Sequence, residues 1–405
     1  MNTGPASVMS DDDVAAERGN AASGADPLAA TPVELGTVLD VITARAPGEE
    51  DAERLSDALV EVLARSGIYR MALPRELGGY GEHPGALCTA VEQISAVDGS
   101  TGWCVAIGAG TNLFAGYLDK RGAGEVFAEP DAGTTSIFAP HGELGWQDGR
   151  WRLSGRWPYG TFCQHAAWIA VNTTVRNQDG TVEPEPRLVF APADEFTIHH
   201  GTWDTAGLRA TGSHDVSAEQ IVIDPRRSCR FNDSAWVDEP LWRIPVFTVL
   251  HSWISASVVG MARGALNAAS EMIIAGEPSH RPLAGSPIAI GEWAAADSAV
   301  RAARAGVRAA LDDVWRMACA RKAVSRSAQA RVLLACIHAC DSCVEAVSTA
   351  HRLAGGASTR RSHFLARCLR DVLTARQHIG FSHDRRATYA MVAAGSDERV
   401  PPFIV

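Results

Sequence analysis

The sequence has no excess of basic residues, which argues against nucleic acid as a partner. Its 405 residues carry 37 Lys and Arg against 47 Asp and Glu, a formal charge of −10, whereas nucleic-acid binders usually present a basic face. It also lacks any run of about 18 uncharged apolar residues, and its beginning is acidic and rich in Ala, Gly and Ser. Neither a membrane span nor a secretory signal is expected, so we predict a cytoplasmic protein with a disordered leader at residues 1–32.

The nine cysteines lack the even count and regular spacing of a disulfide scaffold, which favours reduced thiols. The densest group is Cys336, Cys340 and Cys343, with His338 nearby. The three cysteines share one helical face but His338 points away from it, so a tetrahedral zinc site lacks its fourth ligand. We therefore interpret these cysteines as small core residues and predict no metal.

A complete dinucleotide-binding motif is also missing. The string Gly108–Leu113 lacks the third Gly of the G-x-G-x-x-G pattern and follows a predicted helix instead of a strand. No acidic residue stands at the ribose-binding distance in a strand. Nothing in the chain would therefore hold a nicotinamide cofactor.

What is present falls into three blocks. Apolar residues recur at helical spacing in the first block, at 33–130, and short β-rich runs broken by Gly, Asp and Pro fill the second, at 131–232. The third block, at 233–405, is Ala- and Arg-rich and helically periodic, as in a helix bundle. A strand block between two helical blocks predicts an α+β fold and argues against alternating α/β architecture.

Four segments with recognisable motifs lie across these blocks: Ser66–Gly81, Asp98–Trp103, Trp151–Tyr159 and Gly207–Val216, to which the last block adds Gly355-Gly356 and Arg370–Val372. Together they resemble the acyl-CoA dehydrogenase superfamily over roughly residues 35–395, and in particular its two-component flavin-dependent monooxygenases. The resemblance implies an N-terminal helical domain, a central β-barrel-like domain and a C-terminal four-helix bundle, assembled as a homotetramer.

The resemblance also implies a function. Such an oxygenase component takes reduced FMN or FAD from a separate flavin reductase, forms a C4a-hydroperoxyflavin with O₂, and oxygenates a small aromatic or heteroaromatic substrate. The general chemistry requires a polar group near the flavin N5–H and a cavity from which water is kept out.

The position of the catalytic base separates the two kinds of enzyme in this superfamily. Dehydrogenases with a base in the C-terminal segment place a Glu where this chain has Ile379, which cannot take a proton. His378 matches instead the histidine that the monooxygenases place beside flavin and substrate, where it orients or deprotonates the substrate. A structural histidine at a helix end is the alternative.

The resemblance assigns four more residues to the flavin. Thr161 corresponds to the serine that holds N5, Ser136 to a serine that contacts the ring, Trp103 to an aromatic against the isoalloxazine, and Arg263 to an arginine at the flavin edge. The ordinary alternatives are a turn-forming Thr161, a core Trp103 and a solvated or interface Arg263.

One position departs from the hydroxylase pattern. Where those enzymes carry a second substrate-binding histidine after the Trp, this chain has Thr111 and Asn112, which can form hydrogen bonds but do not titrate near pH 7. Asn112 and His378 are the predicted substrate-binding residues. The missing second histidine favours N-, S- or ipso-oxidation over hydroxylation of a simple phenol. Two alternatives stay open: an acyl thioester dehydrogenase with Glu345 as its base, and a non-catalytic flavin-binding protein.

Overall fold

A computed structural model describes residues 33–275 and 286–396 of the chain, so the predicted leader at 1–32 lies outside the described residues. Helices come first: α2 (Gly36–Ala52), α3 (Asp57–Arg65), α4 (Pro84–Val97), α5 (Gly99–Asn112) and α6 (Lys120–Val126). Side-chain caps fix the starts of four of them, α3 to α6. Ser56 accepts the Leu59 N–H at the start of α3, and Asp98 accepts the Thr101 N–H at the start of α5.

The strands follow as one block: β1 (Thr134–Ile137), β2 (Glu143–Gln147), β3 (Arg150–Gly160), β4 (Trp168–Arg176), β5 (Arg187–Pro192), β6 (Thr197–His199), β7 (His214–Ile223) and β8 (Ser228–Cys229). Their order is β6-β7-β3-β2-β4-β5-β8, with β1 parallel to β4. The parallel pairing of β2 with β4 joins two halves, which are antiparallel apart from the pairing of β1 with β4. Among the described strands the ladder ends at β6 and β8, so the barrel-like domain is open.

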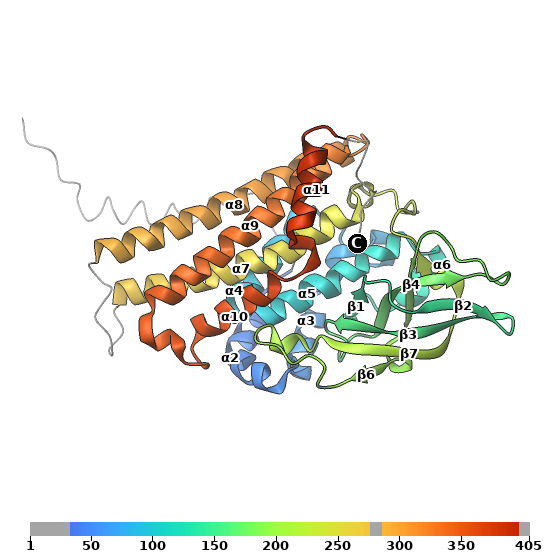
Figure 1. The fold of residues 1–405 in the computed structure, drawn as a ribbon, viewed down its shortest axis with the longest axis horizontal. Coiled ribbons are helices and arrows are strands. Elements are labelled where there is room, and N and C mark those ends of the chain that lie inside the picture. The colour runs from blue at the N-terminus through green and yellow to red at the C-terminus, as the bar shows by residue number, and fades with distance from the viewer. Residues whose placement is uncertain (1–32, 276–285, 397–405) are drawn as a thin grey trace, which may run out of the picture.

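The last block is helical again: α7 (Val246–Ala275), α8 (Pro287–Cys319), α9 (Arg326–Leu353), α10 (Phe364–Ala375) and α11 (His383–Ala393), with the short 3₁₀ turn η9 (Ile379–Phe381) before α11. Helices α7, α8 and α9 run side by side, and α10 packs on α7 and α9 (Figure 1). The predicted order of helices, strands and helices is confirmed.

Among the described helices, only α9 is long and apolar enough to cross a membrane by length and composition. It buries Cys336, Cys340 and Cys343 inside the bundle, while His338 on the same helix is exposed. Burial raises the pKa of the Cys336 and Cys340 thiols to about 12, so both stay protonated. Helix α9 is therefore a core helix, and its cysteines are packed as small hydrophobic residues.

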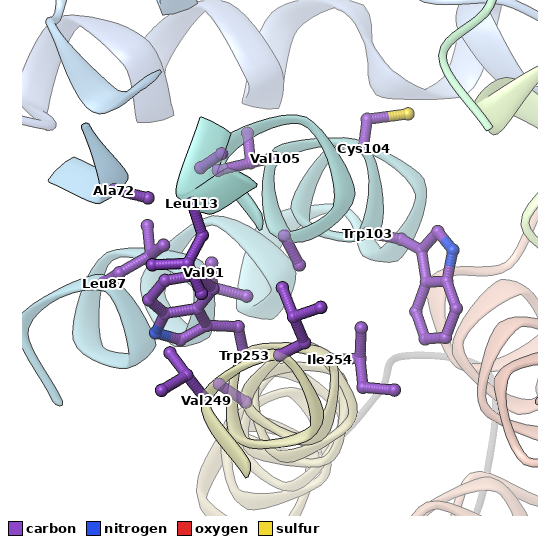
Figure 2. Packing of buried hydrophobic residues seen from close by; sticks show 14 of the residues in the cluster. Ala72, Leu87, Val91, Trp103, Cys104, Val105, Leu113, Val249, Trp253 and Ile254 are labelled. Atoms are coloured by element: carbon purple, nitrogen blue, oxygen red, sulfur yellow. The ribbon is translucent and has the colours of Figure 1, made fainter. Parts of the chain in front are cut away.

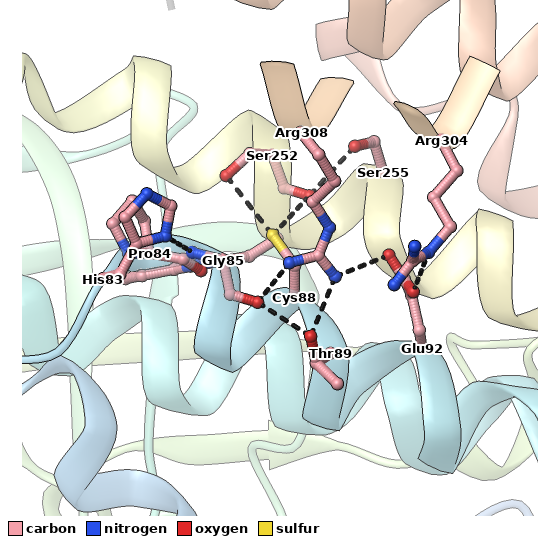
Figure 3. A network of polar contacts seen from close by, with 11 residues as sticks. His83, Pro84, Gly85, Cys88, Thr89, Glu92, Ser252, Ser255, Arg304 and Arg308 are labelled. Carbon is pink, nitrogen blue, oxygen red and sulfur yellow. Dashed lines mark hydrogen bonds and ion pairs between the residues drawn. The ribbon is translucent and has the colours of Figure 1, made fainter. Parts of the chain in front are cut away.

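Helix α7 crosses α4 at very short range. Gly260 and Gly264, one turn apart on α7, face α4, and a Cβ on either would collide with the α4 backbone at Glu92 or Ala96. Beside this contact, Glu92 accepts hydrogen bonds from Arg304 at 2.6 Å and Arg308 at 2.9 Å, both on α8 (Figure 3). One carboxylate thus ties the first helical block to the last.

Candidate functional site

The turn that carries Thr161 is strained. The pairing of β3 with β7 shifts register between Trp157 and Gly160, and two non-glycine residues here take positive φ, Tyr159 at 67° and Phe162 at 65°. Packing holds the strain, because the Phe162 side chain is buried and its N–H donates to the Thr211 carbonyl at 3.0 Å. Bulges and strained backbones of this kind concentrate at functional sites, where they aim a side chain.

The Thr161 hydroxyl has a fixed direction as a hydrogen-bonding group. Thr211 donates its hydroxyl proton to the Leu208 carbonyl at 2.7 Å, so it must accept from Ser213 at 2.8 Å. Ser213 has then used its own proton and must accept from Thr161 at 2.8 Å. Since a hydroxyl has one proton, Thr161 presents only lone pairs to other partners. It is an acceptor, which is what the N5–H of a reduced flavin requires.

This hydroxyl chain is anchored on the bundle. Asp371 of α10 accepts the Leu208 N–H at 2.6 Å, and Leu208 itself takes a left-handed conformation with φ of 52°. Gly207 lies so close to the Arg370 backbone that a side chain would not fit. The two motifs Gly207–Val216 and Arg370–Val372, far apart in sequence, therefore meet and fix the loop that orients Thr161.

Asp371 should make stability depend on pH. Burial, with the nearby Asp98 carboxylate second, raises the pKa of Asp371 to about 7. The folded state thus keeps a proton that the unfolded state loses near its ordinary pKa of about 4, so the free energy of unfolding should fall as pH rises from about 4 to about 7, by at most about 1.4 kcal/mol per pH unit.

Asp371→Asn keeps an oxygen for the Leu208 N–H but cannot ionise. We expect the variant to lose this fall in stability, so that its free energy of unfolding relative to wild type rises between pH 5 and pH 8 in urea denaturation. The exposed Asp194→Asn is the matched control. An unchanged pH slope in Asp371→Asn would show that Asp371 is already ionised throughout this range.

Ser136 of β1 is a second hydroxyl with a fixed direction. Thr111 donates to the Ile107 carbonyl at 2.9 Å, so in its 2.8 Å contact with Ser136 it must accept. Ser136, which is partly exposed, is left with acceptor lone pairs. Asn112 lies apart from this pair: it is buried, donates to the Tyr69 carbonyl at 2.9 Å and accepts from Thr134 at 2.6 Å.

Trp103 and His378 meet. The Trp103 indole of α5 lies edge-to-face with the His378 imidazole, with ring centroids 5.6 Å apart and an interplanar angle of 69°. Figure 2 shows Trp103 extending from α5 beside Ile254 of α7. His378 Nδ1 accepts the Gly380 N–H at 3.1 Å, so the neutral ring carries its proton on Nε2 and donates there. Burial, with His251 second, lowers the pKa of His378 to about 3, which keeps the ring neutral although its side chain is only partly buried.

The sequence reasoning did not identify His251, which lies beside His378. His251 of α7 is buried, and an ideal Cβ on Gly380 would lie 2.5 Å from its Nε2 and 3.1 Å from His378 Nδ1. Burial lowers the pKa of His251 to about 4. Only a tertiary contact joins these two histidines, 127 positions apart, so no local sequence signal could have paired them.

Three other predicted positions are placed as follows. Arg263 on α7 forms an ion pair with Asp297 of α8 at 2.5 Å, twelve residues and about 18 Å along the helix from His251. Ile379 is 57% exposed beside His378. Glu345, the base of the dehydrogenase alternative, is exposed on α9. The structure therefore brings His378 to Trp103 but not to Arg263.

Comparisons with known proteins agree with this fold. Acyl-CoA dehydrogenase models match at both ends, the N-terminal domain at residues 38–127 and the C-terminal domain at residues 252–383. The indole-3-acetate monooxygenase of Pseudomonas putida is 30% identical over 349 residues, 84% of this chain and 88% of the relative. The oxygenase component of the FADH(2)-dependent resorcinol hydroxylase of a Rhizobium species is 26% identical over 300 residues, 72% and 73% of the two chains.

Solved structures give the same result at lower identity. The 3-HSA hydroxylase from Rhodococcus sp. RHA1 superposes with a TM-score of 0.82 at 24% identity, over 91% of this chain and 97% of that one. XiaF from a Streptomyces species, in complex with FADH2 and glycerol, superposes with a TM-score of 0.81 at 23% identity, over 97% and 99% of the chains. The chain therefore belongs to the acyl-CoA dehydrogenase superfamily, within its flavin-dependent monooxygenase branch.

Proposed function

We propose that this protein is the oxygenase component of a two-component flavin-dependent monooxygenase that inserts one oxygen atom from O₂ into a small aromatic or heteroaromatic substrate. The observation that carries the proposal is the hydroxyl chain from Leu208 to Thr161, because it leaves Thr161 as an acceptor. Relatives named indole-3-acetate monooxygenase and resorcinol hydroxylase support the aromatic substrate class.

The residues present fit a reduced flavin. Thr161 would accept the N5–H, Ser136 offers a second acceptor to the ring, and Trp103 supplies an apolar aromatic surface. Reduced FMN or FAD, when bound, supplies the two electrons that activate O₂. Two of the similar solved structures contain a flavin: one is in complex with FADH2 and the other with FMN.

The two catalytic side chains differ in what they do with protons. Thr161 is buried in a strained turn and accepts a hydrogen bond there. His378 donates from Nε2 and therefore orients an oxygen atom of the substrate or of the activated O₂. Burial keeps the His378 ring neutral, so the ring does not repel the nearby Arg385 cation.

The chain's partners follow from the same chemistry. Since the sequence lacks a complete dinucleotide-binding motif and the relatives include oxygenase components, a separate flavin reductase would deliver the reduced flavin by diffusion or transient contact. Arg263 lies far along α7 from His378. It would therefore contact only the end of the flavin that is farther from His378, or a flavin bound to another subunit of a homotetramer. Asn112, which is buried and bonded to Tyr69 and Thr134, would bind the substrate only if these contacts rearranged. We place the enzyme in the cytoplasm, with no membrane or nucleic acid as partner.

Two other functions are the rivals of this proposal, and specific residues argue against the first of them. A thioester dehydrogenase needs a base at the flavin, but Ile379 cannot take a proton and Glu345 is exposed. Enoyl product formed from an acyl thioester without oxygen would restore that rival. A non-catalytic flavin-binding protein would oxidise no substrate in the wild type.

The deciding experiment mixes anaerobically reduced FMN or FAD and protein with oxygenated buffer. With the protein present, we expect oxidised flavin to appear only after a lag that follows oxygen consumption. The same flavin without protein should show no such lag. Phenols, indoles, thiophenes and arylamines are then screened under ¹⁸O₂ for products that gain one labelled oxygen. Flavin oxidation as fast as in free solution, with no labelled product, would exclude the proposed function.

Thr161→Val tests the N5 contact without changing side-chain shape. Losing one hydrogen bond worth about 1.4 kcal/mol should shorten the lag about tenfold, while flavin affinity changes little because the ring surface of Trp103 is untouched. Stopped-flow absorbance measures the lag. Thr173→Val, at a buried threonine of β4 outside the site, should keep the wild-type lag. A wild-type lag in Thr161→Val would remove Thr161 from the mechanism.

A further inference from the structure

His251 and His378 come together from different parts of the bundle. His251 lies near the start of α7, and His378 caps η9 after α10. Both rings border the Cα of Gly380. The contact places a second imidazole behind the one that faces Trp103.

The hydrogen atoms on His251 can be placed from its partner. His251 Nδ1 lies 2.7 Å from the Phe247 carbonyl, which can only accept, so Nδ1 carries the proton. Nε2 of the neutral ring is then a bare acceptor. Nε2 is buried and, among the described residues, has no hydrogen-bond partner. Burying an acceptor without a hydrogen-bond partner destabilises the fold, so the bare Nε2 needs an explanation.

Gly380 is a glycine for reasons of space. Its φ lies outside the left-handed region in which glycine is favoured, so its backbone conformation does not require the missing side chain. What a Cβ would meet is the two imidazoles, His251 Nε2 at 2.5 Å and His378 Nδ1 at 3.1 Å. The glycine therefore leaves no side chain between His251 Nε2 and His378 Nδ1.

We propose that His251 is a positioning residue for His378, whose Nδ1–H it accepts at Nε2 when His378 acts as a base. In the resting state His378 takes the Gly380 N–H at Nδ1 and donates from Nε2. In the second state the proton lies on Nδ1 and the ring turns from the Gly380 N–H toward His251, so the same ring offers a lone pair at Nε2.

This second state gives the site a base. A substrate with a ring O–H or N–H passes that proton to His378 Nε2. Burial disfavours the imidazolium that forms and keeps the pKa of His378 low, and the Nδ1–H bond to the neutral Nε2 of His251 offsets part of that penalty. No electrons move in this step, and the proton leaves with solvent exchange at the partly exposed ring once product departs. The inference rests on the proposed function and narrows its substrates to aromatic compounds that bear such a proton.

The other groups around the pair do not replace His251 in this role. Arg385 of α11 is the charged group that acts on both rings, and as a cation it cannot accept a proton. Trp103 from α5 and Phe381 from η9, which contact the His378 ring, are uncharged. Within the described part of the chain, His251 is the one titratable acceptor on the Nδ1 side.

The first test needs neither flavin nor substrate. In full-length protein labelled with ¹⁵N-histidine at pH 7, imidazole ¹⁵N shifts report the ratio of the Nδ1–H to the Nε2–H form of His378. We expect His251→Phe to lower that ratio about tenfold, the equivalent of one hydrogen bond, and Gly380→Ala to lower it too by wedging the rings apart. His251→Gln, which retains an acceptor oxygen, should restore part of it.

Gly306→Ala is the control for Gly380→Ala, because a Cβ at Gly306 meets nothing within 4 Å; it should keep the wild-type ratio. Equal ratios in wild type, His251→Phe and Gly380→Ala would overturn the proposal. This outcome is independent of whether the protein is an oxygenase.

The second test uses whichever phenol the wild type oxygenates. We expect His251→Phe to lower kcat at least tenfold at pH 7 with KM little changed, and to recover as pH rises past the phenol's own pKa of about 10, where no base is needed. A purely structural role for His251 would give a loss of kcat that does not recover with pH, and that result would count against the pairing.

Discussion

His378→Phe is expected to lower product formation by about 10²–10³-fold, the usual effect of removing a group that handles a proton in the reaction. Phe keeps the aromatic ring that contacts Trp103 and Phe381, so packing is largely preserved. What it removes is the Nε2–H donor and the proton acceptor of the paired state. Flavin should still be oxidised, because Thr161 and Ser136 are unaffected.

The measurement is therefore the ratio of product to oxygen consumed, with released hydrogen peroxide as the balance. We expect oxygen consumption to persist in His378→Phe while almost all of it appears as peroxide. His338→Ala, at an exposed histidine of α9, is the control and should keep the wild-type ratio. A wild-type ratio in His378→Phe would show that His378 is only the cap of η9.

The fold could be predicted because its signals are local. Glycine turns, capping residues and a change from helical to alternating periodicity mark each block within a few residues, and the helices and strands follow them. The same locality placed His378 after the Arg370–Val372 motif and Trp103 after Asp98, and the structure brings these two rings together.

The rest of the site depends on contacts that no local pattern encodes. That Thr161 accepts instead of donating follows from Ser213 and Thr211, some fifty positions later. The proposed role of His251 depends on its contact with His378, the cap of η9, which lies 127 positions later in the chain. Arg263 was assigned to the flavin edge by its neighbours in sequence, but its partner Asp297 depends on how α8 packs on α7.

Stability should depend most strongly on Glu92. Its carboxylate is mostly buried, with 12% of the side chain exposed, and binds Arg304 and Arg308 together; the Arg308 side chain is 14% exposed (Figure 3). Glu92→Ala leaves a buried guanidinium without its counter-charge. Breaking such a pair from one side costs about 3–5 kcal/mol, because the remaining charge stays desolvated. The backbone carbonyl of Gly85, which also accepts from Arg308, can offset only part of this loss.

Urea denaturation of Glu92→Ala measures the change, and Asp313→Ala is the control. Asp313 pairs with Arg316 on the exposed face of α8, where an ion pair contributes about 0–1 kcal/mol. A loss for Glu92→Ala as small as that of the control would mean that water reaches Arg308 once the carboxylate is gone. If the loss is large, charge holds α4 to α8, beside the close approach of α4 to α7 at Gly260 and Gly264.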